Sequence, residues 1–269
     1  MRLKCIACEV LARPLYYCAA RSPHMIDIQF LQKGLHDHPA DLRAQLQDMI
    51  DTAARDKYDA IVLGYGLCGK STHGLVAPRI PLVIPRAHDC ITLFLGSRSR
   101  YNDEFSACPG TYWYAQDYIE RSADSRSSLS MGSGTDTDLQ AVYDEYVERY
   151  GKDNADYLME VMGAWQQHYQ RAVYIDMGVA DGSPVEKLAL EEANRRGWAF
   201  VRLAGDLVLI RRLLEGDWES GDDFLIVPPG KQVDMTMDDA VIRWVEAQKD
   251  KTKSAFQIDQ NDLIIKPGQ

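Results

Sequence analysis

The sequence contains no apolar run that approaches the roughly 18 residues needed to span a bilayer. Its first residues start like a signal peptide, but Glu9 and Arg13 interrupt the apolar stretch too early for one. Basic residues are also in short supply, since 30 Lys and Arg stand against 40 Asp and Glu, a formal net charge of −10. Phosphate recognition requires a basic face, so this balance argues against nucleic-acid binding. Together these absences predict a cytoplasmic protein that binds neither membranes nor nucleic acids.

Cysteine is missing from Thr137 to the end of the chain, and all six cysteines lie earlier, at positions 5, 8, 18, 68, 90 and 108. In a cytoplasmic protein such thiols stay reduced and are available to metals or catalysis rather than paired in disulfides. A racemase-like enzyme with two facing thiols would suit an α/β protein built from two similar halves. The absence of cysteine from the second half argues against that alternative.

The first part of the chain has the pattern of a parallel α/β sheet. Apolar runs predict strands at 3–7, 25–31, 59–63 and 81–84, and helices starting at Glu9 and Pro39 separate the first three. The order is βαβαβ followed by a further strand, which indicates a doubly wound sheet. Residues 91–105 look helical with a break at Gly96, and residues 109–120 read as an aromatic-rich strand or turn that runs into a short helix.

The pattern resets at Ala172, where a second and shorter βαβαβ set begins. Its predicted strands lie at 172–178, 199–203 and 223–230, with helices starting at Pro184 and Asp206. We therefore expect an α/β protein with a mostly parallel sheet, helices on both faces and two Rossmann-like halves. The expected division is an N-terminal half with the functional site (1–120), a mobile Ser/Gly-rich loop (121–136), C-terminal helices (137–150 and 153–169) with the second half up to 248, and a loosely held tail (249–269).

The stretch from Tyr58 to Cys90 contains most of the candidate functional side chains. A strand leads into a glycine-rich turn with Cys68 at its crest, and the next strand leads into a turn with His88, Asp89 and Cys90. The carboxyl ends of parallel strands meet at one sheet edge, and Cys8 closes the first strand at the same edge. We therefore expect three thiols and an imidazole to come together there.

Thiolate and imidazole ligands suit zinc, or iron as the alternative. The predicted metal ligands are Cys8, Cys68, His88 and Cys90, with zinc favoured, and His88 and Asp89 are the candidate catalytic groups. We consider three roles for Asp89: a metal ligand, a helix N-cap, or a partner that orients a metal ligand. Two other interpretations remain open, a catalytic thiol without metal and cysteines that merely fill core space.

Arginines gather beside this turn. In an acidic chain, Arg86, Arg98 and Arg100 could clamp a carboxylate or phosphate, and Tyr101 could roof the pocket. These four residues are the predicted binding residues for a small anionic ligand or a methylated substrate. The ordinary alternative is a solvated helix face with ion pairs.

A second motif competes for the same turn. Gly64 to Ser71, GYGLCGKS, matches the phosphate-binding loop G-x-x-x-x-G-K-[ST], a strand precedes it, and Asp176 could supply a distant acid for magnesium. Such a loop should open a long helix whose N-terminus faces the phosphates. Here only residues 71–80 separate Lys70 from the next strand, and they include Gly74 and Pro78.

Several short motifs in a fixed order resemble those of the family catalogued as domain of unknown function 1638. They are CEVL at 8–11, LHDHP at 35–39, GYGLCG at 64–69, PRAHDCI at 85–91, LGSRSRY at 95–101 and PGTY at 109–112. The resemblance implies an association with corrinoid-dependent methyltransferase systems of one-carbon metabolism. It also implies that Cys8, Cys68, His88 and Cys90 occupy the cysteine- and histidine-bearing positions of the family. The expectation that follows is a metal-dependent methyl-transfer enzyme or accessory factor with a corrinoid protein as partner, the alternative being a non-catalytic carrier of metal or cofactor.

Overall fold

The computed structural model describes residues 1–53, 57–121, 147, 152 and 169–247. The predicted loop at 121–136, the helices predicted at 137–150 and 153–169, and the tail at 249–269 fall almost entirely outside these residues. None of the described helices is both long and apolar enough to cross a membrane.

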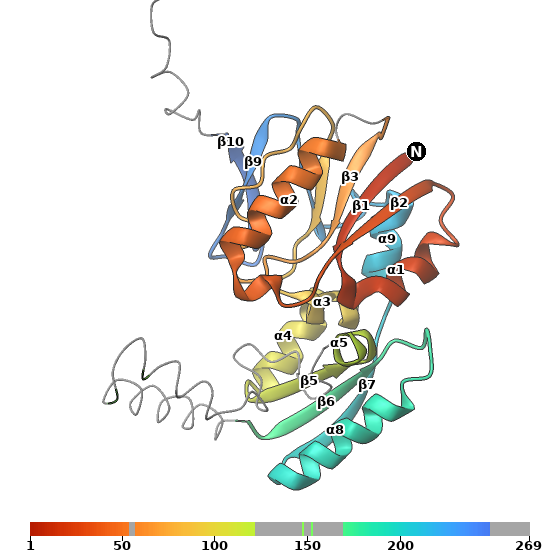
Figure 1. Ribbon diagram of the computed structural model, residues 1–269, viewed down its shortest axis with the longest axis vertical. Coiled ribbons are helices and arrows are strands. Elements are labelled where there is room, and N and C mark those ends of the chain that lie inside the picture. Colours follow the sequence, from red (N-terminus) through yellow and green to blue (C-terminus); the bar gives the residue numbers. More distant parts are fainter. Residues whose placement is uncertain (54–56, 122–146, 148–151, 153–168, 248–269) are drawn as a thin grey trace, which may run out of the picture.

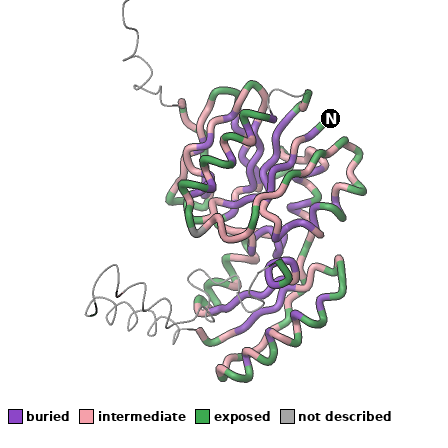
Figure 2. Tube along the Cα trace, in the orientation of Figure 1, coloured by how far each residue is buried: buried purple, intermediate pink, exposed green. Residues whose placement is uncertain are grey.

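The first sheet has five strands in the order β2-β1-β3-β4-β8. The first four are parallel, and β8 runs antiparallel to β4. Their bounds are Arg2–Cys8 (β1), Met25–Leu31 (β2), Ala60–Gly64 (β3), Leu82–Pro85 (β4) and Phe224–Val227 (β8). The inner strands β3 and β4 are buried throughout, because helices cover both faces of the sheet. Figure 2 shows this buried centre.

Alternate side chains of these strands face opposite layers of core. Ile6, Ile61 and Leu63 pack under α2 (Pro39–Ala53), which presents its apolar positions Leu42, Leu46 and Ile50 at helical spacing. The neighbouring positions face the opposite layer, where η1 (Glu9–Leu11), α1 (Ala12–Ala19) and α9 (Val208–Glu215) lie. The first sheet is therefore a three-layer α/β unit (Figure 1).

The second sheet is β5-β6-β7, and all three strands are parallel. They span Thr111–Ala115 (β5), Arg171–Asp176 (β6) and Ala199–Ala204 (β7), with α8 (Ser183–Arg196) packed against them. Between the two sheets lie α3 (Cys90–Leu95), α4 (Arg98–Ala107) and α5 (Gln116–Glu120) (Figure 1). One apolar cluster runs continuously from the first sheet through α3 into the second.

A two-stranded antiparallel hairpin follows β8. Its strands are β9 (Lys231–Met235) and β10 (Ile242–Glu246). The hairpin is held to the turn after β3 by backbone hydrogen bonds, including Gly74 N to Val233 O and Val233 N to Leu75 O, both at 2.8 Å. Val233 and Ile242 are fully buried. The turn between the strands, residues 236–241, forms the tip that reaches the candidate site.

The predicted α/β class and mostly parallel sheet are confirmed, and so are the helix break at Gly96 and the helix starting near Pro184. One connection differs from the second βαβαβ set read from the sequence. The apolar strand β8 leaves that set and pairs with β4 in the first sheet. Conversely β5, which precedes residue 120, pairs with β6. The division at residue 120 therefore stays a prediction. One strand from each side of it, β5 before and β8 after, belongs to the sheet of the other side.

Candidate functional site

The candidate site lies at the carboxyl edge of β1, β3 and β4, where three neighbouring parallel strands end. Cys8 is the last residue of β1 and precedes η1, Cys68 lies in the turn after β3, and Cys90 is the first residue of α3. The two turns are joined by backbone hydrogen bonds, Leu67 N to Ala87 O at 2.7 Å and Cys68 N to His88 O at 2.9 Å.

Gly66 permits this close pairing of the turns. A Cβ atom at Gly66 would lie 2.7 Å from Ala87 O and 2.9 Å from Asp89 N, distances that a carbon atom cannot occupy. Two residues later Cys68 adopts a positive φ of 43°, an uncommon conformation for a residue with a side chain. Cys68 is thus held in a strained backbone conformation beside the turn that contains Cys90.

Burial disfavours ionisation of all three thiols. Burial raises the pKa of Cys68 to about 12, and the negative charges of Cys8 and Asp89 add to the rise. The pKa of Cys90 is raised well above its ordinary value by burial, then by Asp89, Cys68 and Cys8. Burial raises the pKa of Cys8 to about 11. At neutral pH all three are therefore neutral thiols that share one poorly solvated region.

Tyr65 contributes a hydroxyl to the same region. Its side chain is 3% exposed, and its Oη lacks a partner within hydrogen-bonding geometry among the described residues. The hydroxyl lies near Cys8 and works to lower the pKa of that thiol. The sequence analysis missed this residue, because a tyrosine in a glycine-rich turn gives no signal that its hydroxyl is buried.

Asp89 caps α3, one of the roles considered for it. Its Oδ1 accepts from Ile91 N at 3.0 Å and Thr92 N at 3.4 Å, and its Oδ2 accepts from Tyr101 Oη at 3.1 Å. Burial raises the pKa of the Asp89 carboxyl, while these donors work to lower it. The carboxylate is thus an anchor between α3 and α4.

His88 is exposed and lies beside the ring of Tyr101, with 6.3 Å between the ring centroids. Over the described part of the chain, no three His, Cys, Asp or Glu side chains form a group that could hold a metal ion as they stand. The strand ends thus bring Cys8, Cys68, Cys90 and Asp89 to one edge of the sheet, without forming a closed ligand set in the described chain.

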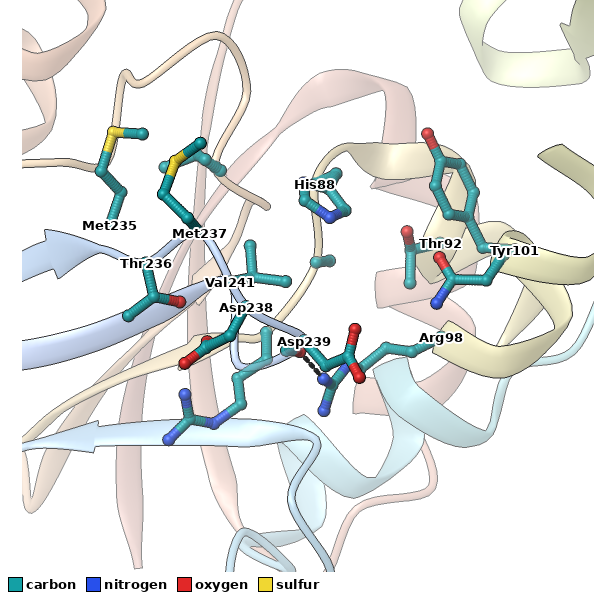
Figure 3. A pocket seen from close by; sticks show the side chains of 14 residues that line it. His88, Thr92, Arg98, Tyr101, Met235, Thr236, Met237, Asp238, Asp239 and Val241 are labelled. Carbon is teal, nitrogen blue, oxygen red and sulfur yellow. Dashed lines mark hydrogen bonds between the residues drawn. The ribbon is translucent and has the colours of Figure 1, made fainter. Parts of the chain in front are cut away.

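A cavity of about 360 Å³ adjoins the paired turns (Figure 3). On one side it is lined by residues of the β4 turn, α3 and α4, among them His88, Thr92 and Tyr101. On the other side lies the hairpin tip, from Met235 to Val241. None of the three cysteines lines it, whereas Leu67, Ala87 and His88 of the paired turns do.

The predicted anion-binding arginines serve another purpose in this arrangement. Arg86 donates to the carbonyl oxygens of Ala240 (3.0 Å) and Ile242 and pairs with Asp222 at 3.1 Å. Arg98 donates to Asp222 O at 2.6 Å and to Asp239 O, the bond dashed in Figure 3. Arg100 makes one long contact of 3.5 Å with Leu95 O. Arg86 and Arg98 therefore fasten the hairpin tip to the rim of the site.

Comparison with known protein families gives one match. The sequence model of the family described as protein of unknown function (DUF1638) matches residues 30–214, well over half of the chain. The chain belongs to the DUF1638 family. The matched region includes Cys68, His88 and Cys90, whereas Cys8 precedes it. No curated protein and no solved structure matches the chain.

In this DUF1638 protein the GYGLCGKS segment does not have the architecture of a phosphate-binding loop. Residues 68–74 form successive turns, and no helix begins between β3 and β4. Lys70 is exposed with a positive φ of 76°. The hydroxyl that would bind magnesium, Ser71 Oγ, donates to Cys68 O at 2.6 Å. The structure therefore gives no support to the nucleotide-binding interpretation.

The remaining cysteines lie apart from the site. Cys5 and Cys18 are buried in the apolar cluster that joins the two sheets, which is the space-filling role considered above. Cys108 follows α4, and its Sγ contacts Gly110 O at 3.8 Å. Cys108 is partly exposed and lies apart from Cys8, Cys68 and Cys90, so its substitution is the control in the metal analysis.

Proposed function

We propose that this DUF1638 protein works through the thiols of Cys8, Cys68 and Cys90 and binds a soft metal ion, Zn²⁺ or Fe²⁺, at that cluster. The observation that carries the proposal is the position of these free cysteines at the ends of β1, β3 and β4, three neighbouring strands of one sheet. Thiols gathered at one sheet edge in this way can share a single ion.

The donor set matches such an ion in kind. Thiolates are preferred ligands of zinc and of iron. A bound cation would reverse the electrostatics, because thiols whose pKa is now raised mainly by burial would be stabilised as thiolates by the ion. Binding must be accompanied by side-chain rearrangement, since the described residues form no complete ligand group at present. His88, next to Asp89 and exposed, is the candidate for a fourth ligand.

The chain's own residues would support the site in distinct ways. Tyr65 Oη would donate to the Cys8 sulfur once that sulfur is a thiolate, since it has no competing partner among the described residues. Asp89 would fix the start of α3, and therefore the backbone of Cys90, through its capping bonds. When bound, the metal would supply a Lewis-acid centre that keeps a coordinated thiol ionised, so that the sulfur could accept a methyl group.

We extend the proposal to corrinoid-linked one-carbon metabolism, as a methyl-transfer enzyme or an accessory factor. Its support is the association implied by the family resemblance, together with the suitability of a thiolate-rich site for methyl transfer. A carrier that holds the metal and releases it to a partner protein is the non-catalytic form of the same proposal. Both forms need the same three thiols.

Metal analysis of anaerobically purified protein tests the first step. We expect stoichiometric zinc or iron in the wild type, loss in Cys68→Ala and Cys90→Ala, and retention in Cys108→Ala. Circular dichroism of each variant checks that the fold persists. Metal-free wild-type protein with a normal fold, or a metal content unchanged by both substitutions, would overturn the proposal.

The corrinoid step is tested separately with methylcobalamin as the probe. Equilibrium dialysis should show retention by the metal-loaded wild type and loss in Cys68→Ala. A metal-binding protein that retains no methylcobalamin, and that does not associate with a methylcobalamin-loaded corrinoid protein, would refute this step and leave the metal site standing.

A further inference from the structure

The cavity beside the hairpin tip has its own chemistry. Its volume of about 360 Å³ falls within the range of small-molecule pockets. None of the cysteines lines it, although His88, the candidate fourth metal ligand, does.

Thr92 provides a polar group without a partner. The residue lines the cavity and is 1% exposed, and its Oγ1 makes no hydrogen bond among the described residues. A threonine hydroxyl in a helix often bonds to the carbonyl four residues back, which here is that of His88. That carbonyl instead accepts from Cys68 N. A buried hydroxyl left without a partner is unfavourable, and a ligand in the cavity would satisfy it.

The charge around the cavity is suited to a cation. The guanidinium groups of Arg86 and Arg98 are compensated by Asp222 and by carbonyl oxygens of the hairpin tip. Two carboxylates of that tip, Asp238 and Asp239, also line the cavity. Asp238 accepts from Ala240 N at 3.0 Å, whereas Asp239 is exposed and forms no ion pair within the described chain.

The other walls are aromatic and thioether surfaces. Tyr101, stacked on Phe105 with 6.2 Å between ring centroids, presents its ring beside His88. Met235 and Met237 line the hairpin side (Figure 3). Aromatic faces attract organic cations, and methionine adapts its shape to small apolar groups.

We propose that this cavity binds a small organic cation, a protonated amine with a short alkyl group. The ammonium lies between the Asp239 carboxylate and Thr92, and the alkyl group packs against Met235 and Leu67. This assignment uses none of the cysteines and shares only the wall residue His88 with the proposed metal site, so the two proposals can fail separately.

A matched series of three-carbon probes tests it on the full chain. Propylammonium, propanol and propionate share one skeleton and differ in charge, and saturation-transfer NMR with titration compares their binding. We expect propylammonium to bind most tightly, propanol weakly and propionate not at all. Equal or tighter binding of propionate would overturn the proposal, as would indistinguishable binding of all three.

Two variants locate the site. Asp239→Asn and Thr92→Val should each weaken propylammonium binding by about fivefold or more, the equivalent of roughly 1 kcal/mol. Asp103→Asn, an exposed change on α4 outside the cavity, should leave binding unchanged. Thr92→Val should also raise the melting temperature, because it removes the buried hydroxyl, so lost affinity cannot be attributed to unfolding. Unchanged affinity in both cavity variants would place the cation elsewhere and refute the assignment.

Discussion

The backbone N–H of Cys68 donates to the carbonyl oxygen of His88 at 2.9 Å. Through this bond the turn after β3 is fixed to the turn after β4, two segments that the sheet alone would leave side by side but unconnected. The thiols of Cys68 and Cys90 owe their proximity to it. Residues that control this pairing should therefore control both stability and thiol chemistry.

Gly66→Ala should separate the two turns. The new Cβ would collide with the backbone at Ala87 and Asp89, so we expect a loss of about 2–3 kcal/mol in unfolding free energy. Urea denaturation measures the loss, and alkylation of the native protein should show faster labelling of Cys68 and Cys90. Gly178→Ala is the control, since its φ is +65° but no atom lies within 4 Å of the added carbon. A smaller loss for Gly66→Ala than for this control would contradict the steric argument.

Stability should fall in alkaline solution. In the unfolded chain the thiols lose protons near the ordinary value of 9.0, whereas folding raises the pKa of Cys8 to about 11 and of Cys68 to about 12. Above the ordinary value the folded protein therefore binds more protons than the unfolded chain, and the unfolding free energy decreases as pH rises. Each thiol should contribute a loss of about 1 kcal/mol per pH unit in that window, until the pH reaches its folded pKa.

Urea denaturation of chelator-treated protein between about pH 8 and about pH 10 measures this slope. Cys8→Ala should make the slope shallower, because one buried thiol is gone. A slope identical in wild type and Cys8→Ala would show that Cys8 ionises in the folded protein as it does in the unfolded chain.

Asp117→Ala should be strongly destabilising. This carboxylate is 4% exposed and accepts from Arg13 N at 3.0 Å, Arg13 Nη1 at 2.6 Å and Arg121 Nε at 3.3 Å. Its removal leaves the Arg13 backbone N–H and two partly exposed guanidinium groups without this acceptor, and we expect a loss of about 2 kcal/mol. Lys187→Ala breaks an exposed pair with Glu191 and should change stability by less than about 0.5 kcal/mol. Similar effects from the two substitutions, compared by thermal or urea unfolding, would argue against a structural role for Asp117.

The substitution Lys70→Gly should stabilise the protein. We expect neither the wild type nor this variant to bind a nucleotide. Lys70 is exposed at a φ of 76°, where glycine avoids a steric cost of roughly 1 kcal/mol. Lys70→Ala removes the same amine but keeps the strain, so its stability should match the wild type. Thermal unfolding with and without Mg-ATP should give no shift in any of the three proteins. An ATP-dependent shift that disappears in both variants would restore the phosphate-loop interpretation.

The first sheet is well predicted because its strands are continuous apolar runs. β2 has the predicted bounds of 25–31, and β1 exceeds its predicted range by one residue at each end. Parallel order then follows from the alternation with helices, and with it the shared edge of Cys8, Cys68 and Cys90. Hydrophobic periodicity and the length of the connections are therefore enough to predict the strand order and this shared edge.

Three features could not be predicted because they depend on distant contacts. The segment of β8, FLIV, reads as a buried strand, but nothing in it specifies β4 as its neighbour. The β9–β10 hairpin is placed by backbone hydrogen bonds to the segment after β3, which no local sequence pattern specifies. The partners of Arg86 and Arg98 are carbonyl oxygens 124 to 156 positions away, which charge counting along the sequence cannot reveal.

The pairing of β8 with β4 also constrains how the chain is made. A ribosome must synthesise the chain through Val227 before the open flank of β4 can be covered. Until then the nascent chain exposes an unprotected row of amides and carbonyls, a surface prone to association with other chains. A fragment ending near residue 120 would keep that flank permanently, so we expect it to aggregate where the full-length protein stays dispersed.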